Sequence, residues 1–190
     1  AIGESYDPAI SADGRYVAFW SSSSNLVAND TNAASDIFVH DRTTGVTERV
    51  SVDSSGTEGN SFSSQPAISA DGRYVAFRSS STNLAPNDTN ATYDIFIHDR
   101  ATGLTERVSV DSSGIGADDS SHRPAVSADG RYVTFESRAS NLVATNLNAR
   151  VDIYVHDRDT GVTERVSVNA NGREGAGDSQ DPVLSADGRY

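Results

Sequence analysis

One unit repeated at a constant interval limits the folds that this sequence can adopt. The hexapeptide SADGRY begins at Ser11, Ser69, Ser127 and Ser185, so each copy starts 58 residues after the one before it, without insertion or deletion. A repeat of this kind predicts one supersecondary unit per period, stacked so that neighbours bury each other's apolar faces. The full units are 11–68, 69–126 and 127–184, with partial units at 1–10 and 185–190.

Each unit predicts four short strands joined by turns. In the second unit, Pro66 is expected to open the first strand, where its missing N–H removes no ladder bond. The pair Asp71-Gly72 predicts a tight hairpin, because Gly tolerates positive φ. No 3.6-residue apolar period lasts for more than a turn, so no helix is expected. The strands are predicted at 66–69, 74–79, 94–99 and 104–110.

Four strands repeated as a meander predict an all-β chain, a β-propeller built of four-stranded antiparallel blades. We expect one propeller segment over residues 1–190, with three full 58-residue repeats and the start of a fourth. Strands such as YVAFWS and DIFVHD carry apolar residues on both faces, as sheets that are covered on both sides require. A β-solenoid is the alternative, although its coils are usually shorter than this period.

The repeated residues resemble those of a known family. PAISADGRYVAF followed by DIFVHDRTTGVTERVSV is similar to the TolB-like PD40 repeat, a WD40-like β-propeller repeat, and all three full units match it. The resemblance implies a propeller fold. It implies little about function, because propellers support binding, scaffolding and catalysis alike. The present unit is longer than the ordinary repeat of that family, and the extra length lies in an Asn-rich loop.

Charge and composition exclude some classes of partner. The chain has 27 acidic and 15 basic residues, all of the latter Arg, for a net charge of −12. This charge argues against nucleic acid and against an anionic membrane surface, and it suits cation binding. The chain has no Cys, so disulfides and thiolate chemistry are excluded, and no apolar run is long enough for membrane insertion.

The first residues bear on processing and location. The sequence begins AIGESYDP, without an initiator Met, which predicts a processed or excised product. We expect a bacterial protein that is extracellular, on the cell surface or periplasmic.

The Asn-rich loop of each unit carries oxygen ligands at positions i, i+2 and i+6, a spacing that suits Ca²⁺. Turn chemistry is the alternative, because Asp and Asn side chains bond the local backbone. The third loop has fewer carboxylates, so weaker binding or none is expected there. The candidate ligands are Asp30, Asn32 and Asp36; Asp88, Asn90 and Asp94; and Asn146, Asn148 and Asp152.

A few polar residues stand out from the repeat. Trp20 lies where the other units have Arg78 and Glu136, and it could stack on a sugar. Asp118, Asp119 and His122 form an irregular group in one inter-unit loop, and with Trp20 they are the candidate ligand-binding residues. The repeated residues are expected to be structural: the imidazoles of His40, His98 and His156 bonding neighbouring strands, and the carboxylates of Glu48, Glu106 and Glu164 pairing with repeated Arg residues.

Three units are fewer than a closed ring of blades needs. The chain is therefore expected to be a fragment of a longer propeller, half of a six-bladed ring, or a subunit of an open stack. The predicted function is a non-enzymatic module for binding or assembly, with a protein or carbohydrate partner or with self-association through its open edges. The alternatives are an accessory or catalytic domain of a carbohydrate- or peptide-processing enzyme, and a structural subunit of an oligomer or filament.

Overall fold

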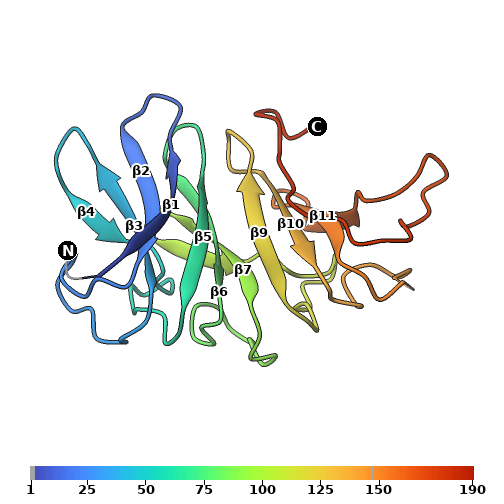
Figure 1. Cartoon of the computed structure of the whole chain (residues 1–190), viewed down its shortest axis with the longest axis horizontal. Helices are drawn as coiled ribbons and strands as arrows, with labels where there is room; N and C mark the ends of the chain where they lie inside the picture. The colour runs from blue at the N-terminus through green and yellow to red at the C-terminus, as the bar shows by residue number, and fades with distance from the viewer. Residues whose placement is uncertain (1–2, 147) are drawn as a thin grey trace.

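The computed structural model describes residues 3–146 and 148–190 and places them in three four-stranded antiparallel sheets. The sheets stand side by side as three blades (Figure 1). Blade 1 contains β1 (Ser5–Ile10), β2 (Tyr16–Ser21), β3 (Asp36–Asp41) and β4 (Thr47–Arg49). Blade 2 contains β5 (Ser63–Ile68), β6 (Tyr74–Ser79), β7 (Asp94–Asp99) and β8 (Leu104–Arg107). Blade 3 contains β9 (Ser121–Val126), β10 (Tyr132–Ser137), β11 (Asp152–Asp157) and β12 (Val162–Arg165).

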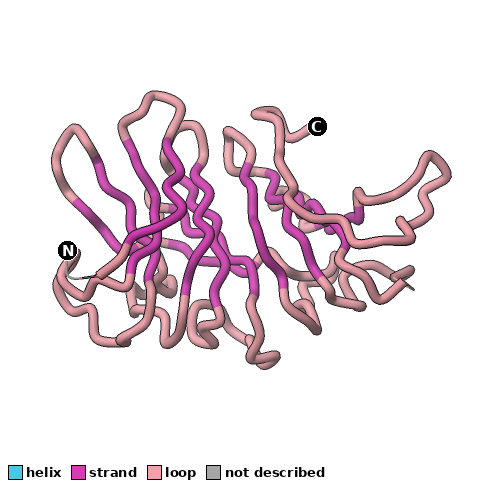
Figure 2. Tube along the Cα trace, viewed as in Figure 1, coloured by secondary structure: helices cyan, strands magenta, loops and turns pink. Residues whose placement is uncertain are grey.

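The strands of each blade are hydrogen-bonded in the order in which they occur in the chain, so each blade is a meander. The first strands β1, β5 and β9 lie next to one another across the stack, and they form the face that is nearest the viewer in Figure 1. Figure 2 shows strands and loops only, and the described residues include no helix able to span a membrane. The predicted all-β architecture of four-stranded propeller blades is confirmed.

The first strand of each blade begins earlier than the sequence predicts. β5 starts at Ser63, and Pro66 lies inside the strand at an irregularity in the pairing between Ser64 and Ala67. Gln65, which precedes the proline, has a φ of 56°. The proline is tolerated because β5 is the edge of its sheet, so its missing N–H interrupts no ladder on the far side. The prediction that Pro66 opens the strand is therefore wrong.

The SADGRY segment forms a longer turn than the two-residue hairpin that its Asp-Gly pair predicts. The N–H of Ser69 donates to the carbonyl of Tyr74, at 2.9 Å, so four residues lie between the closing pair. The carboxylate of Asp71 accepts from the Ser69 hydroxyl at 2.7 Å and from the Arg73 N–H at 2.9 Å. Gly72 has a φ of 75°, which suits a residue without a Cβ.

Neighbouring blades pack through apolar faces: the trailing face of one blade contacts the leading face of the next. The trailing face of blade 1 comprises Ala18, Ile37, Val39 and Val50, and the leading face of blade 2 comprises Val75, Phe77, Leu84 and Phe96. All eight side chains are at most 1% exposed. The same positions, moved by 58 residues, form the junction between blades 2 and 3. Blade 2, which has a neighbour on each side, thus buries apolar residues from both faces of its sheet, as the sequence pattern predicts.

A polar contact is repeated at both junctions beside this apolar core. The ring of Tyr16 lies against Gly72, and the guanidinium of Arg100 lies 4.3 Å from the centre of that ring. Arg100 also pairs with Glu48 of the preceding blade. Tyr74, Gly130, Arg158 and Glu106 repeat the arrangement one blade later. The predicted pairing of repeated Glu and Arg residues is therefore present at both junctions.

The repeated histidines have structural contacts. His98 is buried, and its Nδ1 lies 2.8 Å from the hydroxyl of Thr105 on the neighbouring strand. Thr105 in turn donates its hydroxyl to the carbonyl of Val52 in the preceding blade, at 2.6 Å. His40 and His156 make the same contact with Thr47 and Thr163. These residues tie strand to strand and blade to blade, in agreement with the structural role expected for them.

The packing at the junction between blades 1 and 2 predicts how a substitution at Gly72 affects stability. A Cβ at Gly72 would lie 2.2 Å from the Tyr16 ring, whereas a Cβ at Gly103, which has a φ of 78°, would meet nothing within 4 Å. Both Gly→Ala changes incur the cost of positive φ, about 1–2 kcal/mol, but only Gly72→Ala also overpacks the junction. We expect Gly72→Ala to lower the free energy of unfolding by about 1–3 kcal/mol more than Gly103→Ala. Urea melts of the two variants measure the difference, and equal losses would contradict the packing.

Candidate functional site

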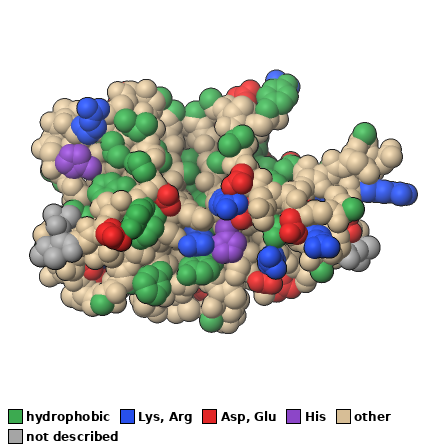
Figure 3. Space-filling model, viewed as in Figure 1, with side chains coloured by type: hydrophobic (Ala, Val, Ile, Leu, Met, Phe, Trp, Pro, Cys, Tyr) green, Lys and Arg blue, Asp and Glu red, His purple; other side chains and the backbone are tan. Residues whose placement is uncertain are grey.

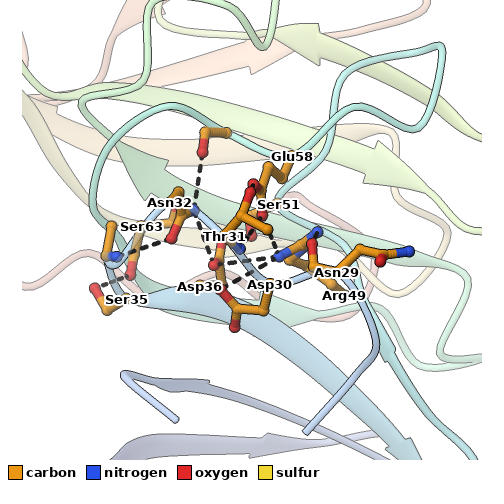
Figure 4. A network of polar contacts seen from close by, with 12 residues as sticks. Asn29, Asp30, Thr31, Asn32, Ser35, Asp36, Arg49, Ser51, Glu58 and Ser63 are labelled. Carbon is orange, nitrogen blue, oxygen red and sulfur yellow. Dashed lines mark hydrogen bonds and ion pairs between the residues drawn. The ribbon is translucent and has the colours of Figure 1, made fainter. Parts of the chain in front are cut away.

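The Asn-rich loop of blade 1 brings three carboxylates together around one arginine (Figure 4). Oxygen atoms of Asp30, Asp36 and Glu58 lie within 4.8 Å of one another. The guanidinium of Arg49 lies among them, with Nη1 at 2.6 Å from Glu58, 3.6 Å from Asp30 and 3.7 Å from Asp36. Asp36 is fully buried, and the Ser51 hydroxyl donates to it at 2.6 Å. We call this group the loop cluster.

Asn32 holds the loop to its neighbours through its amide nitrogen. Nδ2 donates to Asp36 at 3.0 Å and to the carbonyl of Gly59 at 2.9 Å, while Oδ1 accepts from the N–H of Ala34 at 2.8 Å. These partners fix the amide orientation, because a flipped amide would place its oxygen against the oxygen atoms of Asp36 and Gly59. The Asn32 oxygen is therefore used in the local turn, and the amide nitrogen faces the cluster.

Blades 2 and 3 keep the arginine and lose one carboxylate each. In blade 2, Arg107 lies 3.3 Å from Asp88 and 3.6 Å from Asp94, and Gly116 stands where blade 1 has Glu58. The Arg107 guanidinium occupies the adjacent space, since a Cβ on Gly116 would lie 2.4 Å from it. Asn90 bonds Asp94 and the Ala117 carbonyl as Asn32 does in blade 1.

In blade 3 the missing carboxylate is replaced by Asn146. Arg165 lies 2.7 Å from Glu174 and 3.5 Å from Asp152, and Asn148 donates to Asp152. The amide nitrogen of Asn146 donates instead to the hydroxyl of Tyr154, at 3.0 Å, and to the Ala139 carbonyl. Asn146 therefore brings an amide in place of a carboxylate, and its nitrogen is used in these two bonds.

In this arrangement the loop residues do not fit a bound cation. An arginine lies among the carboxylates of every blade, and the amide nitrogens of Asn32 and Asn90 face those carboxylates. Calcium at these loops stays a prediction, and the geometry gives it a specific form: the ion has to displace the guanidinium. The sequence analysis missed Arg49, Arg107 and Arg165, although their recurrence at the 58-residue period was a visible signal.

A second group of residues is marked by where the repeat diverges. The first two strands of the three blades have nearly the same sequence, but three positions in them change chemical class from blade to blade. They lie on the first strands β1, β5 and β9 and on the second strands, which pair with them. We call these nine residues the divergent row: Tyr6, Ser64 and His122; Asp7, Gln65 and Arg123; Trp20, Arg78 and Glu136.

The blade 1 end of the row is aromatic. Tyr6 and Trp20 face each other across the β1–β2 pair, with ring centres 4.6 Å apart and planes at 28°. The Trp20 indole N–H donates to the carboxylate of Asp7 at 2.9 Å. Tyr6 is 43% exposed and Trp20 is half-buried. One face of the indole is thus covered by Tyr6.

The middle of the row joins blades 2 and 3. The Arg78 guanidinium lies 4.2 Å from the centre of the Tyr93 ring, and its Nη1 lies 3.0 Å from Nδ1 of His122. Arg78 also donates to the hydroxyl of Ser64. Because a guanidinium can only donate, Nδ1 of His122 accepts, and the proton of the neutral ring is on Nε2. Burial, and then the charges of Arg78 and Arg123, hold the pKa of His122 below its ordinary value.

The blade 3 end of the row is charged. Arg123 lies 3.4 Å from Glu136 and 2.9 Å from Asp181. Its backbone N–H donates to Oε1 of Gln65 at 2.9 Å. Glu136 is only 6% exposed. Figure 3 shows charged side chains of both signs, with hydrophobic ones between them, across the face formed by β1, β5 and β9. The row therefore offers aromatic, cationic and anionic groups along one surface.

The structure separates the predicted ligand-binding residues. His122 and Trp20 belong to the divergent row, at its middle and at one end. The Asp118 carboxylate accepts from the N–H and the hydroxyl of Ser140, at 2.7 and 2.6 Å, and so closes its loop. Asp119 is exposed and accepts from the N–H of Ser120. The row residues missed by the sequence analysis could have been found by comparing the three units position by position.

Comparison with known proteins bears on the fold. No protein-family model and no curated protein matches the sequence. TolB from Acinetobacter baumannii matches with 20% sequence identity and a TM-score of 0.57, over 98% of this chain and 36% of that chain. A putative TolB from Agrobacterium tumefaciens matches with 22% identity and a TM-score of 0.55, over 85% of this chain and 48% of that one. The fold is a TolB-like β-propeller.

Other propellers match this TolB-like segment as well. The β-propeller domain of the Trilobed protease from Pyrococcus furiosus has 14% identity and a TM-score of 0.53, over 87% of this chain and 42% of that chain. The described chain thus spans less than half the length of each of these proteins. The likeness concerns the fold alone, so the function has to be argued from the residues of the TolB-like segment itself.

The position of Arg49 in the loop cluster predicts how its removal affects the affinity for calcium. If Ca²⁺ binds there, Arg49→Gln is expected to tighten binding about tenfold or more, because it removes a positive charge that competes for three carboxylates. Arg107→Gln is the matched control, since its cluster has two carboxylates and is expected to gain less. Titration calorimetry with CaCl₂ measures both affinities. Absence of binding in the wild type and in Arg49→Gln would contradict the calcium prediction.

Stability is expected to depend on pH in two opposite ways. Burial raises the pKa of Asp30, Asp36, Asp88 and Asp94 above the ordinary aspartate value. A carboxyl with a raised folded-state pKa stabilises the fold at low pH and loses that contribution as pH rises. Bonds from Arg15, Arg73 and Arg131 lower the pKa of a second group, which therefore stabilises the fold until it is protonated: Asp41, Asp99 and Asp157.

Titration of the buried carboxyls is therefore expected to raise the Tm as pH falls toward about 4, and the Tm is expected to decline below about pH 4. His98, His122 and His156 act in the opposite direction below about pH 6.5, because burial lowers the pKa of each imidazole. Asp94→Asn is expected to flatten the rise, because Asp94 is fully buried and no longer titrates in the variant. Calorimetric melts across this pH range measure both effects. A difference in Tm between the wild type and Asp94→Asn that does not change with pH would mean that Asp94 does not have the raised pKa assigned to it.

Proposed function

We propose that this chain is a non-enzymatic propeller module that binds a protein segment along the divergent row. The observation that supports it is the location of the sequence divergence. Residues that close turns and join blades are repeated almost without change, as for example Tyr16, Gly72 and Arg100 at one junction. Within the first two strands of each blade, the residues that change class gather on one surface, where their variation does not disturb the packing.

The chemistry of the row favours an extended polar ligand. Stacked aromatic rings lie at one end, a guanidinium and a neutral imidazole in the middle, and an arginine between two carboxylates at the other end. Side chains of an extended peptide can meet each of these groups in turn, and the propeller fold supports binding functions among others. Aromatic residues and arginine are also the types that contribute most to protein interfaces.

The internal bonding of the row supports binding over catalysis. Arg78 is hydrogen-bonded to Ser64 and His122, and Arg123 is ion-paired with Glu136 and Asp181. Groups fixed in this way are preorganised to donate and accept hydrogen bonds, which lowers the entropy lost on binding. A carbohydrate ligand, which would stack on the Tyr6–Trp20 pair, is the alternative outcome of the experiment below. Secretion or display on a bacterial surface stays a prediction.

Selection from a phage-displayed random peptide library tests this proposal. We expect enriched peptides to bind the wild type and to lose about tenfold or more in affinity with Arg78→Ala or Trp20→Ala, as truncation of interface anchors does. Arg173→Ala, an exposed loop change outside the row, is the control and should bind as the wild type does. Trp20 is the only tryptophan in the chain, so its fluorescence reports occupancy directly.

The same protein applied to a glycan array separates the two ligand classes. Binding to glycans that depends on Trp20, without enrichment of any peptide, would replace the protein ligand by a carbohydrate. Peptides that bind Arg78→Ala and Trp20→Ala as well as they bind the Arg173→Ala control would mean that the divergent row is not the binding surface.

A further inference from the structure

One position of the repeat is a glutamate in blades 1 and 3 and a glycine in blade 2. Gly116 does not have the left-handed φ that favours glycine, so its backbone conformation accepts a side chain. The backbone at this position forms the same isolated antiparallel bridge in each blade: Val52 with Glu58, Val110 with Gly116, and Val168 with Glu174. The three positions are therefore equivalent, and what blade 2 lacks is the carboxylate.

Blade 1 shows how a carboxylate is held at this position (Figure 4). Nη1 of Arg49 lies 2.6 Å from Glu58, and the N–H of Thr31 donates to the same oxygen atom of Glu58 at 3.2 Å. The hydroxyl of Thr31 donates to the other oxygen atom. In blade 3, Glu174 accepts from Arg165 at 2.7 Å. An arginine thus binds the glutamate in both blades, and in blade 1 a threonine contributes two further donors.

The arginine of blade 2 is held in place without such a partner. The Arg107 side chain is only 8% exposed, and its Nη2 donates to the Asn87 carbonyl at 3.2 Å. Its closest carboxylate oxygen belongs to Asp88 and lies 3.3 Å away, compared with 2.6 Å between Arg49 and Glu58. Arg107 therefore lacks the close carboxylate contact that the arginines of blades 1 and 3 have.

A cavity of about 260 Å³ lies beside this arginine. Arg107, Thr89 and Gly116 line the cavity, and they are the counterparts of the three residues that meet in blade 1. The N–H and the hydroxyl of Thr89 form no hydrogen bond to any residue that the structure describes. Ile115 also lines the cavity and is 61% exposed. The volume is below the range of about 300–1,000 Å³ found for drug-sized ligands, so the cavity suits one small group.

The negative charge near Arg107 does not prevent an anion from binding. Asp88 and Asp94 lie 3.3 and 3.6 Å from its guanidinium, and neither of them lines the cavity. In blade 1 the equivalent pair of aspartates tolerates Glu58 as a third carboxylate beside one arginine. Hydrogen bonds between a guanidinium and a carboxylate are among the stronger ones in proteins. A carboxylate in the blade 2 cavity therefore repeats an arrangement that the chain already forms.

We propose that the cavity of blade 2 binds the carboxylate of an external ligand, at the position that corresponds to the Glu58 carboxylate of blade 1. Arg107 and Thr89 donate to the carboxylate, and Ile115 contacts the short aliphatic arm that bears it. Free short-chain acids and the glutamate side chains of a peptide both have this chemistry. The proposal does not depend on the ligand of the divergent row, because none of the row residues lines this cavity.

Propionate is the probe, because it has the carboxylate and the aliphatic arm of a glutamate side chain. In two-dimensional amide NMR spectra at neutral pH and constant ionic strength, propionate is expected to shift the signals of Thr89 and Gly116 saturably. A dissociation constant in the millimolar range is expected for so small a ligand. Propionamide has the same shape without the charge, and it is expected to bind about tenfold more weakly or less. Equal binding of the two compounds would overturn the recognition of a carboxylate.

Two variants test whether the shifts arise in the cavity. Gly116→Glu supplies the carboxylate from the chain itself and is expected to abolish propionate binding. Its Cβ would lie 2.4 Å from the Arg107 guanidinium, which is the end of a flexible side chain and can move. Thr89→Val removes a hydroxyl from an exposed residue and is expected to weaken binding about threefold or more. Thr31→Val is the matched control in blade 1, where Glu58 already fills the site, and it should leave propionate binding unchanged.

The amide spectra also show whether each variant is folded. An absence of saturable shifts at Thr89 and Gly116 in the wild type, or propionate binding that persists in Gly116→Glu, would overturn the proposal. The same titration with the peptide acetyl-Gly-Glu-Gly-amide separates the two sources of the carboxylate. Binding of the peptide at least as tight as that of propionate assigns the cavity to acidic side chains of a partner, whereas binding of propionate alone assigns it to free acids.

Discussion

A four-stranded sheet with apolar residues on both faces cannot be stable in water by itself, and this constraint shapes the whole molecule. Blade 2 buries one face against blade 1 and the other against blade 3. A buried side chain such as Phe77 contributes about 1.5–3 kcal/mol relative to an exposed one, so the loss of a neighbour exposes several such contributions at once. The stability of a blade therefore belongs mainly to its junctions.

Strict repetition in the sequence follows from this dependence. Every junction has to accept the same partner surface, so a residue such as Gly72 is constrained by Tyr16 in the neighbouring blade and not only by its own turn. An exact period also makes the fold predictable, because the apolar alternation and the turn residues can be compared three times in one chain. The four strands of each blade and their order could be derived in this way, and the structure confirms them.

The wrong or missing predictions concern edge strands and contacts between residues that are distant in the sequence. Pro66 was expected at the beginning of a strand, but an edge strand tolerates proline in its interior, and the alternation of side chains does not reveal which strand is the edge. Two of the candidate ligands, Asp30 and Asp36, do lie close together, whereas calcium binding stays a prediction. The arginine among them comes from β4, the fourth strand of the same blade, and spacing within the loop contains no information about it.

Electrostatics explains why an arginine suits the loop clusters. Two or three carboxylates that lose contact with water repel one another, and the interaction grows as the local dielectric constant falls. A guanidinium offers several donors in one plane and can serve more than one carboxylate. The clusters keep this balance as the repeat diverges: blade 2 lacks the glutamate and blade 3 lacks the first aspartate, so each retains two carboxylates for one arginine. Blade 1, with three carboxylates for one arginine, is the cluster with the largest excess of negative charge.

The divergent row varies from blade to blade in a different way from the loop clusters. In the loop clusters, a change at one position leaves the pairing of the remaining groups intact, as selection for stability would require. In the row, Trp20, Arg78 and Glu136 occupy one backbone position and differ in size, charge and hydrogen bonding. No common structural role could be served by all three. Their backbone surroundings are the same in each blade, so the scaffold holds the strands in place whichever residue is present, and the row is free to vary with what it contacts.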